Sequence, residues 1–269
     1  MINGSNWWAL FHNLFILYNL INHMKRGIIL LSLILGCNNM NEDEMKIVFL
    51  GDSITEAGVY DKEVGVEYNG ELVYPDYTGF ITLLSQNISE NTKLIGKGIS
   101  GDKVPDLLTR YRKDVLDLKP DLVFIYIGIN DVWHKYDFGT GSDIDLYEDG
   151  LRQIISEIQK IGSKVVLCTP TVIGENHGDF TLANQYVEHY RDAKTMESMN
   201  NDLDAFSDVV RKLSSEYNTG LIDLRKVFVN YISENNPTNK PSGILTYDGV
   251  HLNDLGNKLI ADQMINFIN

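Results

Sequence analysis

The sequence has few of the residues that cross-link small secreted scaffolds or bind polyanions. Its 269 residues include only two cysteines, Cys37 and Cys168, so no framework of disulfide bonds is available to the fold. Lysine and arginine number 23 against 37 aspartates and glutamates, which gives a net charge of -14. Because nucleic-acid binding needs clustered basic residues, this balance argues against a nucleic-acid partner and is easier to reconcile with a neutral or cationic substrate.

The sequence also lacks an apolar segment long enough to cross a membrane. Two apolar stretches occur near the N-terminus, at residues 7–21 and 27–35, and both are shorter than the roughly 20 residues that a spanning helix needs. The second stretch follows the basic pair at residues 25–26 and ends in Ile-Leu-Gly-Cys. This order is typical of a signal peptide, although an uncleaved N-terminal anchor is the alternative.

The end of this segment, residues 34–37, resembles a bacterial lipobox, in which Cys37 is acylated after cleavage before it. The resemblance implies a lipoprotein that is anchored to a membrane of the cell envelope. Residues 1–37 are then an upstream extension and a signal peptide, and residues 38–44 form a short acidic tether. We expect residues 45–269 to be the folded domain, because no linker, repeat or low-complexity tract divides them.

From residue 45 onward, short β-branched segments alternate with longer segments of helical period. This alternation predicts an α/β fold with helices on both faces of a parallel sheet. Near-continuous apolar runs indicate strands that are buried on both faces. The five predicted strands are residues 45–50, 93–95, 122–127, 164–168 and 220–222.

Three apolar stripes with spacings of three and four residues predict helices over residues 147–161, 203–217 and 255–267. Gly162 is expected to end the first, and Asn253 is expected to cap the last. The long polar segments 56–76, 171–195 and 233–246 are predicted loops at one end of the sheet. Ligands of open α/β sheets bind outside the carboxyl ends of the strands, so these loops are the expected walls of a site.

Ser53 is the candidate nucleophile, because it lies where the first apolar strand ends, in Gly51-Asp52-Ser53-Ile54-Thr55. A serine hydroxyl needs a base to take its proton and a group to orient that base. Asp248 and His251 are three residues apart in a short turn and can supply both. The alternative is that Asp248-Gly249 is only a turn and His251 a surface residue.

Acyl transfer also needs donors that face the developing oxyanion. Strand 122–127 is followed by Gly128-Ile129-Asn130-Asp131, which places the Asn130 amide at the same sheet edge as Ser53. Strand 93–95 is followed by a glycine-rich segment, residues 96–102, that offers backbone N–H groups. A side-chain amide and two backbone amides can form a complete oxyanion hole.

These segments, taken in order, resemble the four sequence blocks of the SGNH (GDSL-type) esterase and lipase family. They are Gly51-Asp52-Ser53-Ile54, Gly98-Ile99-Ser100-Gly101-Asp102, Gly128-Ile129-Asn130-Asp131 and Asp248-Gly249-Val250-His251. The resemblance implies a three-layer, flavodoxin-like fold with a five-stranded parallel sheet. It also implies that Ser53 is the nucleophile, that His251 is the base and acid, and that Asp248 orients His251. Ser53 and Gly101 would donate to the oxyanion through their backbone, and Asn130 through its side chain.

Other chemistries are less consistent with the sequence. Gly96, Gly98 and Gly101 match a dinucleotide-binding fingerprint, but the acid at Asp121 precedes its strand instead of following it. Gly51-Asp52-Ser53-Ile54-Thr55 lacks the second glycine of an α/β-hydrolase elbow. His177 and His189 have no ligand spacing around them. Cys168 lies in an apolar strand, which keeps a thiol inert. We therefore expect no metal and no cofactor.

The expected substrate is an ester with a short acyl group, plausibly an acetyl group on carbohydrate, since the sequence shows no apolar lid or acyl tunnel. Aromatic side chains near the nucleophile could stack on sugar rings or simply pack their loop. They are Tyr60, Tyr68, Tyr74, Tyr77 and Trp133, with His134 beside them. The alternatives are a lysophospholipase or thioesterase, and a glycan-binding lipoprotein without activity. No obligate protein partner is evident.

Overall fold

A five-stranded parallel sheet runs through the computed structural model, which describes residues 44–68, 70–176 and 193–268. The strand order is β4-β1-β5-β6-β7, and all neighbouring strands are parallel. The predicted α/β fold with a five-stranded parallel sheet is therefore confirmed. Its strands are β1 (Met45–Gly51), β4 (Thr92–Gly98), β5 (Leu122–Tyr126), β6 (Lys164–Cys168) and β7 (Gly220–Ile222).

The strand β4 is longer than the predicted segment 93–95, because it continues through the glycines that the sequence indicated as a turn. Gly96 and Gly98 pair with Phe49 and Gly51 of β1. A Cβ atom at Gly98 would lie 2.0 Å from the backbone nitrogen of Glu56. Glycine therefore extends this strand for a packing reason, since it lets the helix α2 (Ser53–Ala57), which follows β1, approach the sheet closely.

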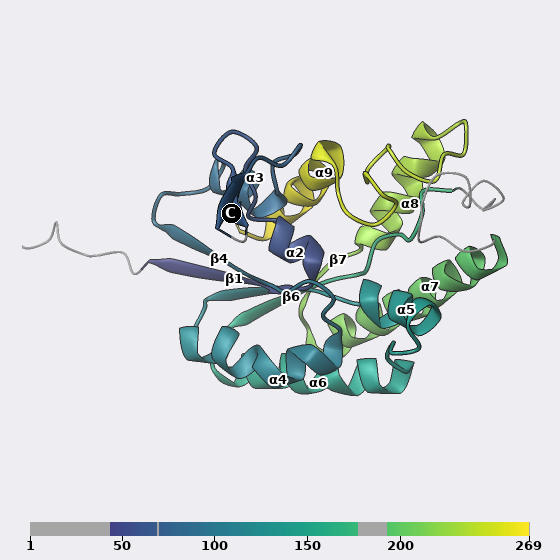
Figure 1. Cartoon of the computed structure of the whole chain (residues 1–269). Coiled ribbons are helices and arrows are strands. Elements are labelled where there is room, and N and C mark those ends of the chain that lie inside the picture. The colour runs from purple at the N-terminus through teal and green to yellow at the C-terminus, as the bar shows by residue number, and fades with distance from the viewer. Residues whose placement is uncertain (1–43, 69, 177–192, 269) are drawn as a thin grey trace, which may run out of the picture. The chain divides into compact units, whose positions relative to one another are not determined.

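Helices cover both faces of the sheet and complete three layers (Figure 1). The helices α3, α8 and α9 lie on one side of it, and α4, α5, α6 and α7 lie on the other, as Figure 1 shows. A short helix, α2 (Ser53–Ala57), follows β1 directly. The longer helices are α3 (Phe80–Ser85), α4 (Val104–Asp114), α5 (Ile129–Asp137), α6 (Ile144–Lys160), α7 (Ala193–Tyr217), α8 (Leu224–Asn235) and α9 (Asp254–Met264).

Most residues of the predicted apolar stripes face the core. Tyr147, Leu151, Ile154, Ile155 and Ile158 are buried along α6, and Leu203, Phe206, Val210 and Leu213 are buried along α7. The first stripe, residues 147–161, was wrong at its C-terminal end. Ile161 follows the last residue of α6 and is exposed, because Gly162 turns the chain with a φ of 86°.

The last predicted helix is shorter than its stripe. The helix α9 ends at Met264, and both Leu255 and Phe267 are exposed, which contradicts their predicted place in the stripe. The N-cap was predicted correctly, since the side chain of Asn253 accepts a hydrogen bond from the Gly256 N–H at 3.0 Å. The start of this helix fixes where the preceding loop, with Asp248 and His251, rejoins the core.

The predicted loop segments contain some regular structure. Segment 56–76 includes the end of α2 and a small hairpin, β2 (Val66–Tyr68) with β3 (Glu71–Val73). Segment 171–195 includes the start of α7, and segment 233–246 includes the end of α8. Short 3-10 turns occur at Leu116–Leu118 and Ile265–Phe267.

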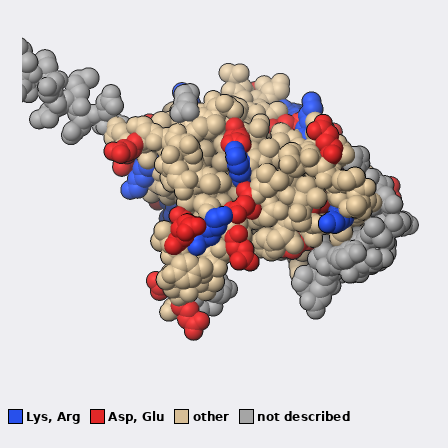
Figure 2. Space-filling view, turned by 90° about the horizontal axis from the view of Figure 1, so that it is seen from above, with Lys and Arg blue, Asp and Glu red and all other residues tan. Residues whose placement is uncertain are grey.

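The predicted signal peptide, with Cys37 and nearly all of the tether, lies outside the described residues. Within the part of the chain that is described, no helix combines the length and the apolar character needed to span a membrane. On the face shown in Figure 2, lysine and arginine side chains lie beside acidic ones and form no continuous basic area. Exposed pairs such as Lys258 with Asp262, at 2.6 Å, contribute little to stability but keep the surface charge mixed.

Candidate active site

Ser53 lies at the carboxyl end of β1, as the first residue of α2. The preceding residue, Asp52, caps this helix, and its Oδ1 accepts a hydrogen bond from the Ile54 N–H at 3.0 Å. Burial raises the pKa of the Asp52 carboxyl to about 7, against the opposing effects of this hydrogen bond and of His251. The strand end and the cap therefore hold Ser53 at a helix N-terminus, where backbone N–H groups point outward.

The structure brings Ser53, His251 and Asp248 into one hydrogen-bonded series. His251 Nε2 lies 3.0 Å from Ser53 Oγ, and His251 Nδ1 lies 2.7 Å from Asp248 Oδ2. The other carboxylate oxygen, Asp248 Oδ1, accepts from the backbone N–H groups of Val250 and His251 at 2.9 and 2.7 Å. Both oxygens of Asp248 are thus engaged, and the carboxylate cannot rotate without breaking one of these bonds.

The charges of this series favour an imidazole that can take up a proton. Burial lowers the pKa of His251, but the hydrogen bond and charge of Asp248, with the charge of Asp52, raise it above its ordinary value overall. Burial raises the pKa of Asp248, but the contact with His251 and the two backbone N–H groups bring it below its ordinary value. Asp248 therefore stays ionised and stabilises the protonated form of His251.

Gly101 and Asn130 follow the two strands on either side of β1. Gly101 lies in the turn after β4, with a φ of 82° that side chains rarely allow. Asn130 lies in the first turn of α5 after β5, and its side chain is buried. Its Nδ2 donates to the carbonyl of Asp102 at 3.1 Å, which orients the amide and leaves its second N–H to donate elsewhere.

Arg110 on α4, which no sequence pattern indicated, links the two loops that carry Ser53 and Gly101. Its guanidinium donates to the carbonyls of Gly51 and Lys97 at 2.8 and 3.0 Å, and to Asp102 at 2.7 Å. One planar cation thereby fixes the end of β1 relative to the end of β4.

Two acidic side chains add further links between these loops. Glu56 on α2 accepts from the backbone N–H of Ser100 at 2.8 Å and also from its hydroxyl. Asp131 follows Asn130 and is buried, and it accepts from the Val104 N–H, which starts α4, at 3.1 Å. Burial raises the pKa of Asp131 to about 6, against its hydrogen bonds. These contacts join residues that are distant in the sequence, so no local pattern indicates them.

A row of tyrosines extends from His251, and we call Tyr60, Tyr77 and Tyr247 the tyrosine row. Successive ring centroids lie 6.3 Å apart for Tyr60 and Tyr77, 6.0 Å for Tyr77 and Tyr247, and 5.8 Å for Tyr247 and His251. Neighbouring planes differ by at most 21°. Tyr247 is 54% exposed. The row therefore offers an accessible aromatic surface beside the imidazole.

The other aromatic residues indicated by the sequence take different places. Trp133 tilts toward His251 at a centroid distance of 6.4 Å, and its indole N–H donates to Asp137. Tyr74 is exposed in the loop after β3, and the side chain of Tyr68 lies outside the described residues. Among the aromatic residues next to the imidazole, Tyr247 was not predicted from the sequence, although it directly precedes Asp248.

Two glycines of the dinucleotide fingerprint, Gly96 and Gly98, serve close packing beside β4. Gly96 faces Val59, and Gly98 faces the backbone of residues 52–56, so side chains and backbone occupy the space beside both. Cys168 is buried at the end of β6, and burial raises its pKa well above the ordinary value. The histidines His177 and His189 lie outside the described residues, and the described ones contain no group of three or more His, Cys, Asp or Glu that could hold a metal.

The sequence profile of the GDSL-like Lipase/Acylhydrolase family matches residues 49–259. An acetylxylan esterase of Geobacillus stearothermophilus is 29% identical over 222 residues, which cover 80% of this chain and 90% of that protein. An uncharacterized lipoprotein of Bacillus subtilis (strain 168), YqeF, is 26% identical over 247 residues, covering 89% and 96%.

Solved structures show the same similarity. The crystal structure of an acetyl xylan esterase, AlAXEase, matches with a TM-score of 0.67 and 40% identity, over 84% of this chain and 100% of that one. The crystal structure of Axe2, an acetylxylan esterase from Geobacillus stearothermophilus, matches with a TM-score of 0.63 and 29% identity, over 84% and 94%.

Proposed function

Because the chain belongs to the GDSL-like lipase/acylhydrolase family and is a carboxylic ester hydrolase, we propose that it removes acetyl groups from carbohydrate through Ser53, His251 and Asp248. The observation that carries this proposal is the unbroken series of hydrogen bonds from Ser53 Oγ through both imidazole nitrogens to Asp248. Such a series makes a serine hydroxyl nucleophilic at neutral pH.

The reaction proceeds in two halves. In the first, Ser53 Oγ attacks the ester carbonyl carbon while His251 Nε2 takes the hydroxyl proton, and a tetrahedral intermediate forms. His251 then gives this proton to the oxygen of the leaving sugar, and the bond between that oxygen and the acyl carbon breaks. In the second half, water attacks the acetyl group on Ser53 with His251 as base. The collapse of this second intermediate returns the proton to Ser53 and releases acetate.

The oxyanion of each intermediate is proposed to accept hydrogen bonds from the backbone N–H groups of Ser53 and Gly101 and from Asn130 Nδ2. The position of these three donors supports this role, because each follows the carboxyl end of one of the adjacent strands β4, β1 and β5. The bond from Asn130 to Asp102 orders the amide before substrate arrives. Donors fixed in advance need no reorganisation as the negative charge develops.

The tyrosine row supports a carbohydrate as the leaving group. Tyr247, at one end of the row, stacks on His251, which must protonate the departing alcohol. A sugar whose oxygen receives this proton therefore lies beside Tyr247. Aromatic rings present apolar faces and polar hydroxyl tips, which suit the C–H faces and hydroxyls of a sugar. The named activity of the acetylxylan esterases that resemble this chain points to the same class of substrate.

The test compares two kinds of ester. Acetate release from acetylated xylooligosaccharides and hydrolysis of nitrophenyl acetate are measured beside hydrolysis of nitrophenyl octanoate. We expect the acetyl esters to be preferred and Ser53→Ala to abolish all three activities. A strong preference for octanoate would favour a lysophospholipase or thioesterase, and a folded wild-type protein without hydrolysis would favour a glycan-binding protein.

The substitution Tyr247→Ala tests the carbohydrate contact itself. Loss of this ring is expected to lower kcat/KM for the acetylated oligosaccharide, while kcat/KM for nitrophenyl acetate, which has no sugar, changes much less. Tyr74→Ala is the matched control, since Tyr74 is similarly exposed but lies outside the tyrosine row. An equal loss on both substrates for Tyr247→Ala would contradict a role in sugar binding.

We also propose that the protein is a cell-envelope lipoprotein, which is cleaved before Cys37, acylated on Cys37 and tethered by residues 38–44. The support is the lipobox-like segment at residues 34–37 and the name of the similar Bacillus subtilis lipoprotein. Incorporation of labelled fatty acid is expected in the wild type and not in Cys37→Ala. Unchanged labelling of Cys37→Ala would contradict acylation at this residue.

A further inference from the structure

The loop between α8 and α9, residues 236–253, carries both Asp248 and His251. Its only described pairing of strand type is an isolated bridge between Thr246 and Leu252. An irregular loop leaves its backbone N–H groups to find partners outside a helix or a sheet. The position of the two catalytic side chains therefore depends on what binds the backbone of this loop.

The side chain of Glu175 binds the loop just before Asp248. It is fully buried, and its Oε1 accepts from the N–H groups of Leu245 and Thr246, both at 2.6 Å, and from Thr246 Oγ1 at 2.8 Å. Its Oε2 accepts from the Ile244 N–H at 2.7 Å. An ionised carboxylate is the one side-chain group of this size that offers only acceptors, as these converging donors require.

Thr246 extends this contact to the turn at Asp248. A hydroxyl has one hydrogen, and here Thr246 Oγ1 donates it to Glu175. The lone pairs of the same oxygen then face the Gly249 N–H, which donates to it at 3.0 Å. A second bond supports this turn, because the Gly174 N–H donates to the Gly249 carbonyl at 2.8 Å. The N–H group of Gly249 is thus held by Glu175 through Thr246, and its carbonyl is held by Gly174.

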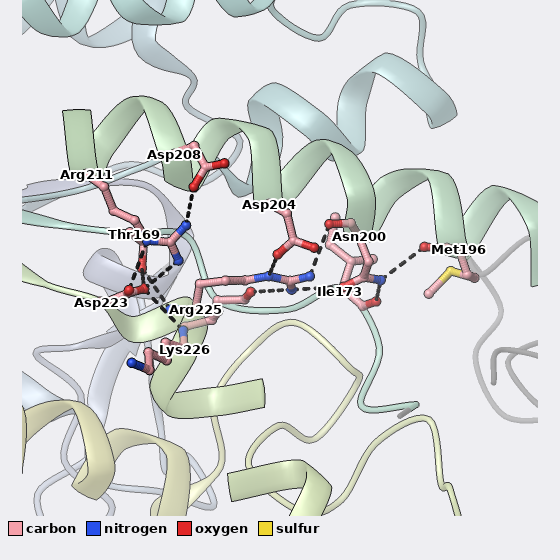
Figure 3. A network of polar contacts seen from close by, with 11 residues as sticks. Thr169, Ile173, Met196, Asn200, Asp204, Asp208, Arg211, Asp223, Arg225 and Lys226 are labelled. Carbon is pink, nitrogen blue, oxygen red and sulfur yellow. Dashed lines mark hydrogen bonds and ion pairs between the residues drawn. The ribbon is translucent and has the colours of Figure 1, made fainter. Parts of the chain in front are cut away.

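The segment between β6 and Glu175 is held by a network of polar contacts that includes Arg225 and Asn200 (Figure 3). The guanidinium of Arg225, which is buried at the start of α8, donates to the Thr171 carbonyl at 2.8 Å. Asn200 on α7 donates to the Ile173 carbonyl at 2.7 Å, and the Arg225 N–H donates to Thr169 Oγ1 at 2.8 Å. Two helices therefore fix the residues that lead to Glu175.

We propose that Glu175 is a positioning residue of the hydrolase, which holds residues 244–246 so that the turn after them presents Asp248 and His251 to Ser53. The inference rests on the proposed roles of those three residues. Glu175 touches no reacting atom and acts through Thr246 and Gly249. Its loss leaves Ser53 and its strand end unchanged and affects only the acid and base.

The substitution Glu175→Gln tests this role. A glutamine has one acceptor oxygen and an NH2 group, so at least one of the loop donors meets another donor in place of an oxygen. We expect kcat for nitrophenyl acetate to fall roughly 10- to 100-fold, as for a small misplacement of a catalytic group, with KM little changed. Glu197→Gln removes the same charge at an exposed position and is expected to leave kcat unchanged.

The pH profile separates positioning from a general loss of structure. The acid limb of kcat/KM reports the protonation of His251, which Asp248 of its own loop and Asp52 at the end of β1 both favour. The neutral rings of Tyr247 and Trp133 lie against the same imidazole. A loosened contact with Asp248 lowers the pKa of His251, so the acid limb of Glu175→Gln moves to lower pH. A smaller fraction of folded enzyme would lower the rate at every pH and leave the limb in place.

A second pair of variants leaves the carboxylate intact. Thr246→Val removes the hydroxyl between Glu175 and Gly249, and Thr246→Ser keeps it. We expect Thr246→Val to shift kcat and the acid limb in the same directions as Glu175→Gln, though less, and Thr246→Ser to resemble the wild type. This pair decides the question if Glu175→Gln does not fold.

The inference is overturned if folded Glu175→Gln keeps the wild-type kcat and acid limb, or if Thr246→Val and Thr246→Ser behave alike. A failure of the proposed function is distinguished by Ser53→Ala. If that variant keeps its activity, the proposed nucleophile is wrong, whereas an inactive Ser53→Ala beside a fully active Glu175→Gln contradicts only the role of Glu175.

Discussion

The two halves of the candidate site are built in different ways. Ser53, Gly101 and Asn130 follow three adjacent strands, so the parallel sheet itself brings them together. Asp248 and His251 lie in a long loop, and the buried side chain of Glu175 holds the backbone that precedes them. The nucleophile half therefore depends on the order of strands, and the acid-base half depends on a few hydrogen bonds to one carboxylate.

This difference predicts how each half responds to substitution. In the nucleophile half, a changed side chain removes its own interaction, because the strands still determine the backbone. In the acid-base half, a change that leaves Asp248 and His251 intact can still move them. The following substitutions test this contrast.

The largest effect is expected for Asp248→Asn. The asparagine keeps an oxygen for the N–H groups of Val250 and His251, so the loop is preserved, but its NH2 group faces His251 Nδ1. This favours the wrong tautomer, and a fall in kcat of about 10⁴-fold is expected at neutral pH. Steady-state kinetics on nitrophenyl acetate measure it, with circular dichroism as the control for folding. A kcat near that of the wild type would exclude Asp248 as the orienting acid.

Asn130→Ala is expected to lower kcat by roughly 10²- to 10³-fold, because one donor to the oxyanion is lost. KM should change little, since the interaction strengthens mainly as negative charge develops. Pre-steady-state measurement of the acylation rate on nitrophenyl acetate locates the loss in the chemical step. If Asn130→Ala lowered the stability of the fold but left kcat unaffected, its buried amide would serve only the turn at Asp102.

Asp52→Asn tests the buried carboxyl beside the nucleophile through stability. The pKa of Asp52 is raised to about 7 in the folded protein. The protonated carboxyl therefore stabilises the fold fully below the pKa that Asp52 has in the unfolded chain, and this stabilisation is lost as pH rises through about 7. An asparagine side chain can still accept the hydrogen bond from the Ile54 N–H, and because it does not ionise, it does not lose this stabilisation at higher pH. The gain in unfolding free energy over the wild type should therefore rise from pH 5 to pH 8, reaching roughly 2–4 kcal/mol. Urea unfolding at both pH values measures it, and an equal difference at both would contradict the raised pKa.

The smallest effect is expected for Asn253→Ala, which removes the cap of α9 and one hydrogen bond to the Ile244 carbonyl, at the end of the loop that carries Asp248 and His251. Stability should fall by about 1 kcal/mol, as for other N-caps. Well below the unfolding temperature, kcat should stay close to the wild-type value, because Glu175 still holds residues 244–246. Thermal unfolding and kinetics on one preparation measure both. A large loss of kcat would mean that the cap of α9, and not Glu175, positions His251.

The sequence predicted the sheet well because its signals are local. Buried parallel strands are largely apolar, as in residues 122–127, and Ser53 and Asn130 lie shortly after two such strands, β1 and β5. The glycine-rich end of β4 was missed, because glycine has a low strand propensity and is needed here to admit α2 beside Gly98 and Val59 beside Gly96. The helical stripes were wrong at Ile161 and Phe267, because the apolar periodicity continues past the residue where the helix ends, and at Leu255, which is exposed in the first turn of α9.

The contacts that position the site could not be predicted from local patterns. Arg110 reaches the backbone of Gly51, 59 residues away, and Glu175 reaches that of Leu245, 70 residues away. A charged residue in a polar segment usually faces solvent, so the composition of the segment does not indicate that Arg110 will bind backbone carbonyls or that Glu175 will bind backbone N–H groups. Tyr247 was missed because its partner in the row, Tyr77, comes from a different loop.

The most direct test of the central claim is covalent labelling with a fluorophosphonate, followed by peptide mass spectrometry. The reagent reacts with a serine only when an adjacent base activates its hydroxyl. We predict one phosphonyl group per chain, located on Ser53, with labelling lost in Ser53→Ala and strongly slowed in both Asp248→Asn and Glu175→Gln. Labelling of another residue, or unchanged labelling of Ser53→Ala, would contradict the proposed active site.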